Sequence, residues 1–123
     1  MILAIDFDGT IVRGQFPAID GLVPDSKMYI KSLKNMGHYI IINTCRSGQN
    51  AIDAVNFLLH HEIPFDRFND NEPTQVEKYN SNSRKVYAHV YIDDKQVGGL
   101  PAWSEIYDYI CDVEAKYKQN SEK

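Results

Sequence analysis

The stretch AIDFDGTIV, residues 4–12, places two aspartates one residue apart at the end of an apolar run. Asp6 and Asp8 repel each other, so both stay ionised only where a cation or hydrogen-bond donors offset the repulsion. The run that precedes them is typical of a strand buried on both faces of a parallel sheet. The stretch is therefore either a solvated turn after a strand or a functional site.

An alternation of helices and strands follows. A loop with several glycines and prolines occupies residues 13–24. Apolar periodicity then predicts a helix that Asp25 caps and Gly37 ends, a second buried strand at 38–44, and a helix that Ser47 caps.

The second half of the chain continues this pattern. We expect a short strand at 64–68, an irregular segment rich in asparagine and serine at 69–84, a strand at 85–94, and a last helix that begins near Trp103. The positions expected to face the core are Tyr29, Leu33 and Met36; Ile52, Val55, Leu58 and Leu59; Val86, Ala88, Val90 and Ile92; and Trp103, Ile106, Ile110, Val113 and Tyr117.

This order of elements predicts an α/β fold of the three-layer, Rossmann-like type. Its central sheet would be mostly parallel, with helices on both faces. We expect one domain over residues 1–115 and a polar, disordered-looking tail at 116–123.

Composition narrows the class of protein. The chain has 123 residues, of which 43% are hydrophobic and 24% charged, as in ordinary globular domains. Its net charge is −4 and no run is rich in Lys or Arg, so no nucleic-acid-binding patch is expected. No apolar stretch approaches the roughly 20 residues of a membrane span, and no membrane contact is expected. Cys45 and Cys111 lack C-x-x-C spacing, which favours a cytoplasmic protein with free thiols.

Acidic and hydroxyl side chains follow three of the predicted strands. Asp6 and Asp8 end the first, Thr44 ends the second, and Asp93 with Asp94 ends a later one. Because parallel strands bring their carboxyl ends to one edge, four carboxylates and a hydroxyl should converge there. Oxygen ligands without Cys or His favour Mg²⁺ over Zn²⁺. Such a site most often serves phosphoryl transfer.

The same residues resemble the motifs of the haloacid-dehalogenase-like phosphohydrolases. Asp6-Phe7-Asp8-Gly9-Thr10 resembles their D-x-D-G-T signature, and Thr44 resembles the Thr or Ser of the second motif. Asp93-Asp94 resembles the acidic fourth motif. Lys85 is the candidate for the lysine of the third motif, with Lys78 and Lys95 as rivals. The resemblance spans residues 2 to about 95 in the family's order.

The resemblance implies a role for each motif. Asp6 would be the nucleophile that forms an aspartyl phosphate, and Asp8 the general acid and base. The metal ligands would come from Asp6, Asp8 (through its main-chain carbonyl) and Asp93, with Asp94 in support. Asp8 also favours phosphate-ester hydrolysis over dehalogenation, because the family's dehalogenases do not need that acid/base.

Other residues are expected to hold the phosphate. Thr44 and Lys85 would supply a hydrogen bond and a positive charge. Phe7, Gly9 and Thr10 belong to a tight turn whose backbone N–H groups would face the phosphate. Arg46 either contacts phosphate or substrate, or pairs with an acidic group.

Spacing predicts a capless member of the family. The intervals from Thr10 to Thr44 and from Thr44 to Lys85 are filled by the expected elements and leave no room for a cap domain. The site would then be open, and a homo-oligomer or a large substrate could compensate. The substrate would be a phosphorylated small molecule or macromolecule. Two alternatives stay open: a phosphotransferase that uses the same site, and a non-catalytic, receiver-like module that binds phosphate and Mg²⁺.

Overall fold

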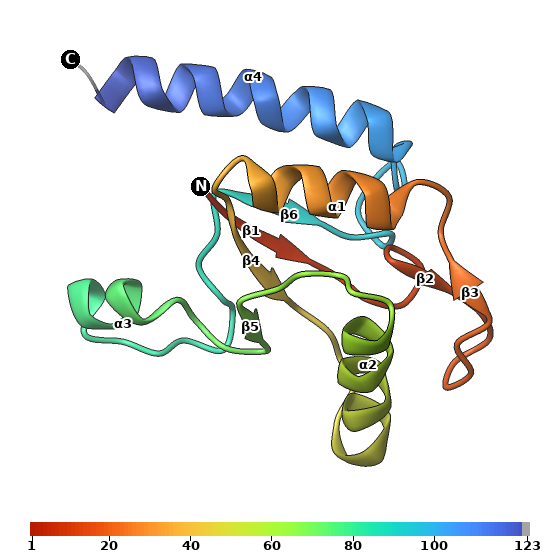
Figure 1. The fold of residues 1–123 in the computed structure, drawn as a ribbon. Coiled ribbons are helices and arrows are strands. Elements are labelled where there is room, and N and C mark those ends of the chain that lie inside the picture. The colour runs from red at the N-terminus through yellow and green to blue at the C-terminus, as the bar shows by residue number, and fades with distance from the viewer. Residues whose placement is uncertain (122–123) are drawn as a thin grey trace.

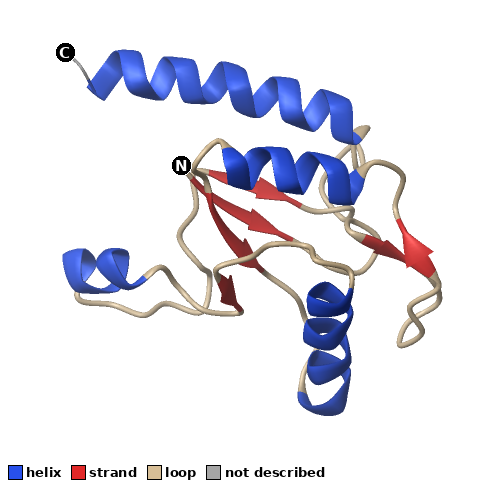
Figure 2. Ribbon diagram, viewed as in Figure 1, coloured by secondary structure: helices blue, strands red, loops and turns tan. Residues whose placement is uncertain are grey.

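A single parallel sheet organises the computed structural model, which describes residues 1–121 (Figures 1 and 2). Four parallel strands lie in the order β5-β4-β1-β6, and β2 and β3 form a separate antiparallel hairpin. The elements are β1 (Ile2–Ile5), β2 (Val12–Arg13), β3 (Gly21–Leu22), α1 (Ser26–Asn35), β4 (Tyr39–Ile42), α2 (Gly48–His60), β5 (Arg67–Phe68), α3 (Pro73–Tyr79), β6 (Val90–Ile92) and α4 (Trp103–Ser121).

The register of the central strands fixes where the polar residues lie. β1 is buried along its whole length because it has a neighbour on each side. Its last residue, Ile5, lies opposite Ile42 of β4 and Ile92 of β6. The residues that follow these three strands therefore meet at one edge of the sheet, at the right-hand end of β1 in Figure 1.

The two faces of the sheet are covered differently. On one face, β1, β4 and β6 share a large apolar cluster with residues of α1, α2 and α4. The opposite face carries a small cluster, in which Val86 and Ala88 cover Ile2, Ala4 and Ile41. No residue of a described helix belongs to this small cluster. Helices flank the sheet, which is consistent with a Rossmann-like α/β fold. The prediction of helices on both faces is wrong for the described residues, because a loop covers the second face.

Two helices bury only part of the predicted stripe: Leu33 and Leu58 are buried as predicted, but other predicted residues are not. In α1 the buried residues are Ser26, Ile30 and Leu33, whereas Met36 is exposed at the C-cap. In α2 they are Ala54 and Leu58; the predicted core residues Ile52 and Leu59 are exposed. Asp25 and Ser47 occupy the N-cap positions as predicted, but neither side chain caps its helix.

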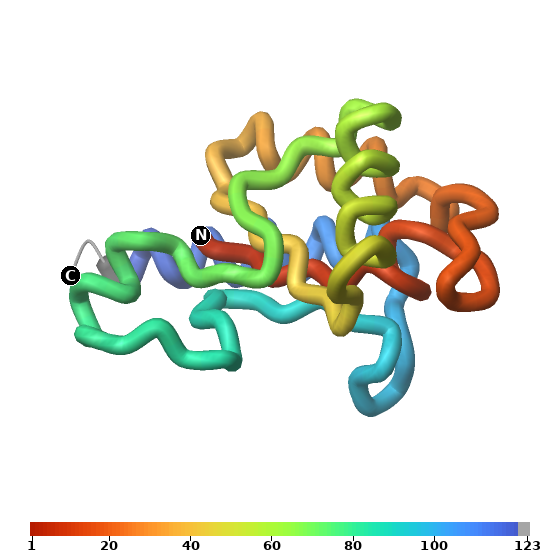
Figure 3. The backbone as a smooth tube through the Cα atoms, turned by 90° about the horizontal axis from the view of Figure 1, so that it is seen from below, coloured from red at the N-terminus to blue at the C-terminus, as the bar shows by residue number. Residues whose placement is uncertain are grey.

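The segment between β5 and β6 departs most from expectation. Residues 73–79 form α3. Pro73 is its first residue, and the side chain of Glu72 caps its N-terminus. The predicted strand at 85–94 is paired only over 90–92, because the chain before it crosses beneath the sheet (Figure 3). Val86 and Ala88 therefore pack on the opposite face from Val90 and Ile92, and the prediction of one shared face is wrong.

The C-terminal segment is helical where a tail was predicted. Residues 116–121 continue α4, and residues 116–120 are all exposed. Residues 122 and 123 of the predicted tail lie outside the described part of the chain. No helix among the described residues has the length and apolar character needed to cross a bilayer.

Asp66 offers a test of how β4 is held. Its Oδ2 accepts the backbone N–H of the buried Ile40 at 2.8 Å and pairs with Lys34 at 2.7 Å. We expect Asp66→Ala to lower the free energy of unfolding by about 1–3 kcal/mol, because a buried N–H loses its acceptor. Lys34→Ala removes the same ion pair but leaves that N–H bonded, and should cost at most about 1 kcal/mol. Urea denaturation of both variants measures the difference, and equal losses would contradict the assignment.

Candidate functional site

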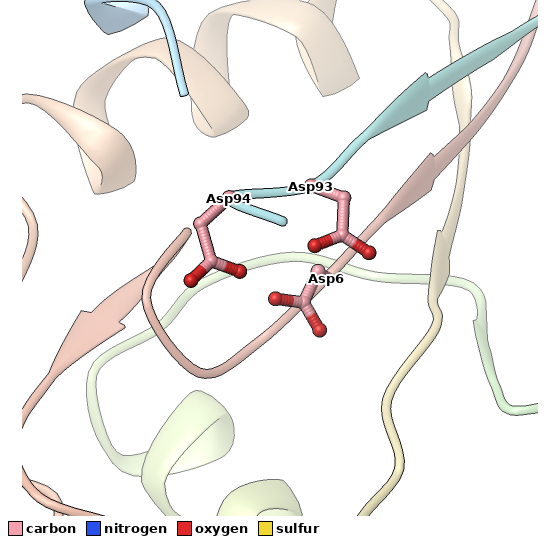
Figure 4. A group of neighbouring side chains, drawn as sticks. All are labelled: Asp6, Asp93 and Asp94. Atoms are coloured by element: carbon pink, nitrogen blue, oxygen red, sulfur yellow. The ribbon is translucent and has the colours of Figure 1, made fainter. Parts of the chain in front are cut away.

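Three carboxylates converge at the carboxyl ends of β1 and β6. Asp6 follows β1 directly, and Asp93 and Asp94 follow β6. One carboxylate oxygen from each lies within 4.8 Å of the others, and all three side chains turn toward a common space (Figure 4). The backbone of Asp6 is fixed by a 2.9 Å hydrogen bond to the carbonyl of Ile92. The structure thus brings together three of the four carboxylates that the sequence placed at this edge.

Thr10 ties the two strand ends together. Its hydroxyl donates to Asp6 Oδ2 at 3.2 Å and accepts the backbone N–H of Asp94 at 3.1 Å. Its carbonyl accepts the indole N–H of Trp103 at 3.0 Å. Thr10 is fully buried, so these bonds are shielded from water. The residue braces the carboxylate cluster rather than presenting its side chain to a ligand.

Gly9 lets the turn after β1 approach Asp94. Its φ is +80°, and a Cβ at this position would overlap the carboxylate of Asp94, with 2.7 Å to Cγ. Both the backbone conformation and the space therefore favour glycine. The predicted role of this turn in phosphate binding is wrong for two of its amides, because the N–H of Gly9 donates to the carbonyl of Val12 and that of Thr10 to the carbonyl of Phe7.

The cluster holds unbalanced charge. Burial raises the pKa of Asp6 to about 7, and hydrogen bonding to Asp94 and the charge of Asp93 add to that effect, against the opposing bond from Thr10. Oδ1 of Asp94 is buried and has no hydrogen-bond partner among residues 1–121. A hard divalent cation would satisfy this oxygen and replace the proton on Asp6, so the all-oxygen donor set fits Mg²⁺.

Asp8 lies outside this cluster and pairs with Arg46. The guanidinium donates to both carboxylate oxygens of Asp8, at 2.8 Å each. Arg46 is 3% exposed, and the bond to Asp8 raises its pKa further above the ordinary value, against the effect of burial. Of the two roles that the sequence left open for Arg46, the structure shows pairing with an acidic group. The carboxylate of Asp8 consequently faces the guanidinium and not the other three.

Thr44 follows β4 at the same edge of the sheet as the cluster. Asn69, which the sequence analysis did not single out, holds its loop. The Oγ1 of Thr44 accepts the backbone N–H of Arg46 at 3.2 Å, and the N–H of Thr44 donates to Asn69 Oδ1 at 2.7 Å. Asn69 directly follows β5, at the same edge of the sheet. The rule that located Asp6 and Asp93 would have found it, had residues 69–84 not been treated as one irregular segment.

The structure does not bring Lys85 into contact with the carboxylates. Its Nζ lies 5.0 Å from the centroid of the Tyr91 ring. Lys78 lies over Tyr79 in α3, which is remote from the cluster. Lys95 is nearest along the chain, and its backbone N–H donates to Asp93 Oδ1 at 2.9 Å. No lysine side chain forms an ion pair with the cluster in the described residues.

Phe7 contributes its backbone to the site, while its side chain is fully buried and packs edge-on against Phe57 at 6.2 Å. Its carbonyl accepts three turn amides, from Thr10, Ile11 and Val12. The N–H groups of Phe7 and Asp8 find no acceptor in residues 1–121. They remain available to an anion, so any contact of Phe7 with phosphate would be made by its main chain.

Comparison with solved structures places the chain in a family. The structure of a conserved protein from Bacteroides thetaiotaomicron matches it with a TM-score of 0.82 and 34% sequence identity, over 91% of this chain and 90% of that one. This chain belongs to the same family as that protein. No family model and no curated protein matches the chain. Family membership therefore establishes the fold over almost all of the chain and leaves the activity to be argued from the site.

Gly9→Ala tests the close approach of the turn to Asp94. We expect a loss of about 1–3 kcal/mol in the free energy of unfolding, with loss of the increase in melting temperature that Mg²⁺ causes, because Asp94 is displaced. Gly37→Ala is the matched control: its φ is +93°, but nothing lies within 4 Å of the added Cβ. It should be destabilised and still respond to Mg²⁺ in thermal melts. A Gly9→Ala protein with the full Mg²⁺ response would refute the constraint.

The raised pKa of Asp6 predicts how stability depends on pH. Without metal, the folded state binds the Asp6 proton more tightly than the unfolded state, whose pKa is near 3.8. Stability from this group is therefore complete below that value and is lost as the pH rises toward 7. Melting with EDTA and with Mg²⁺, at about pH 5 and about pH 8, should show a larger Mg²⁺ stabilisation at the higher pH. Asp6→Asn should remove the difference, and an equal effect of Mg²⁺ at both values would contradict it.

Proposed function

We propose that the protein is a Mg²⁺-dependent, capless phosphohydrolase of the haloacid-dehalogenase-like type. The observation that carries this proposal is the convergence of Asp6, Asp93 and Asp94 within 4.8 Å, with the buried Asp94 Oδ1 unpartnered among the described residues. The D-x-D-G-T motif that begins with Asp6 adds support, as does an inserted hairpin, β2–β3, too small to be a cap domain.

Asp6 acts as the nucleophile on a phosphate monoester. One of its carboxylate oxygens attacks phosphorus in line, a bond from Asp6 to phosphorus forms, and the bond from phosphorus to the ester oxygen breaks. Asp8 gives its proton to the departing oxygen, so the products are an aspartyl phosphate and an alcohol. Thr10 holds the attacking side chain through its bond to Oδ2.

Water completes the reaction. Asp8, now a carboxylate, takes a proton from a water molecule that attacks phosphorus, and the bond to Asp6 breaks to release inorganic phosphate. The free N–H groups of Phe7 and Asp8 and the hydroxyl of Thr44 are donors for the phosphoryl oxygens. Arg46 orients Asp8 by its two hydrogen bonds, which must loosen when Asp8 takes up its proton.

Asp6, Asp93 and Asp94 are the residues that would hold Mg²⁺. The ion would supply the positive charge that a carboxylate nucleophile and a phosphate dianion both need in order to approach each other. No lysine side chain in the described residues reaches the cluster to supply that charge instead. Lys85 precedes Val86, which packs on Ile2, and His89 bonds to the carbonyl of Ile2, so Lys85 lies toward the amino end of β1, away from the carboxylates, and we assign it no contact with phosphate.

Asp6→Asn tests the nucleophile. We expect p-nitrophenyl phosphate hydrolysis to require Mg²⁺, to stop with EDTA, and to fall by about 1,000-fold or more in this variant. Asp8→Asn should fall by about 100- to 10,000-fold. Asp108→Asn, an exposed aspartate on α4, is the matched control and should keep wild-type activity.

Three outcomes separate the competing functions. Full activity in Asp6→Asn would refute the assignment of the nucleophile. Product phosphorylated at an added alcohol would indicate a phosphotransferase that uses the same site. A wild-type protein that releases no phosphate, yet forms a stable aspartyl phosphate with acetyl phosphate, would indicate a receiver-like module.

A further inference from the structure

Arg46 joins the site to the tip of the β2–β3 hairpin. Besides both oxygens of Asp8, its guanidinium donates to the carbonyl of Pro17 in the hairpin at 3.0 Å and to that of Asn50 in α2 at 3.2 Å. A buried arginine with four hydrogen bonds is a rigid anchor. The position of the hairpin tip relative to Asp8 is therefore fixed.

Phe16 lies at that tip and contacts the guanidinium of Arg46 with its ring. The guanidinium carbon of Arg46 lies over both rings, 5.2 Å from the centroid of Phe7 and 5.0 Å from that of Phe16. Phe7 is fully buried, whereas Phe16 is 59% exposed. Single exposed apolar side chains are common on protein surfaces. Phe16 differs in contacting the same guanidinium that binds both oxygens of Asp8, which places its ring near that carboxylate.

We propose that Phe16 is the contact for the leaving group, and that the substrates are phosphate monoesters whose leaving group carries an aromatic or flat apolar ring. This inference rests on the proposed function, in which Asp8 serves the leaving-group oxygen. A ring attached near that oxygen would lie against Phe16, where stacking and burial favour it over a small alkyl group. Phe16 is thus a specificity-determining residue supplied by the hairpin.

Benzyl phosphate and ethyl phosphate provide the test, because both release a primary alcohol and differ in the ring. We expect the wild type to prefer benzyl phosphate. Phe16→Ala should lower kcat/KM for benzyl phosphate about tenfold, chiefly through KM, and change that for ethyl phosphate by at most about twofold. Phe16→Tyr should keep the preference. Leu59→Ala, an exposed apolar residue of α2, is the control and should change neither value.

The outcomes separate this inference from the proposed function. Turnover of both esters with no preference for the ring, or an equal loss on both in Phe16→Ala, would overturn the role of Phe16 and leave the phosphohydrolase standing. No Mg²⁺-dependent phosphate release from either ester or from p-nitrophenyl phosphate would overturn the proposed function, and this inference with it. Thermal melts of each variant confirm folding, and Phe16→Leu repeats the test without a ring if Phe16→Ala does not fold.

Discussion

The site depends on the hydroxyl of Thr10, because this one oxygen atom is bonded both to the residue that follows β1 and to a residue that follows β6. It donates to the side chain of Asp6 and accepts from the backbone of Asp94, while the carbonyl of the same residue is held by Trp103 at the start of α4. Thr10 thereby fixes the positions of Asp6, Asp94 and the start of α4 relative to one another. Like charges can then be kept close, since the backbone that carries them cannot relax apart.

Much of this edge follows from the sequence. The apolar runs of β1 and β4 predict buried parallel strands, and parallel strands end at one edge, so the meeting of Asp6 with Asp93 and Asp94 is a consequence of topology alone. The partner of Arg46 cannot be predicted from the sequence in this way. Its pairing with Asp8 across 38 positions depends on how the hairpin and α2 pack, which no local pattern encodes.

The missed elements have physical reasons. Residues 86, 88, 90 and 92 alternate as in one strand, but the chain turns before β6, and the first two cover the opposite face. That face lacks a helix in the described chain, so a loop supplies its apolar cover. The start of α3 could have been predicted, because Glu72 supplies a side-chain cap and Pro73 stands in the first turn. The asparagines and serines around these two residues favoured a loop instead.

In the proposed mechanism, a cation would have to balance the negative charge at this edge of the sheet. The site sets three carboxylates together, and its buried arginine is already matched by Asp8. A phosphate dianion brought to Asp6 would add charge of the same sign beside a carboxyl group whose pKa is already raised to about 7 by burial and by the neighbouring carboxylates. Neutral donors, such as the amides of Phe7 and Asp8, orient an anion but cannot cancel this repulsion. In the proposed phosphohydrolase, a divalent ion at these carboxylates would supply the charge that lets substrate and nucleophile approach each other, so metal binding and phosphate binding at this edge would depend on each other.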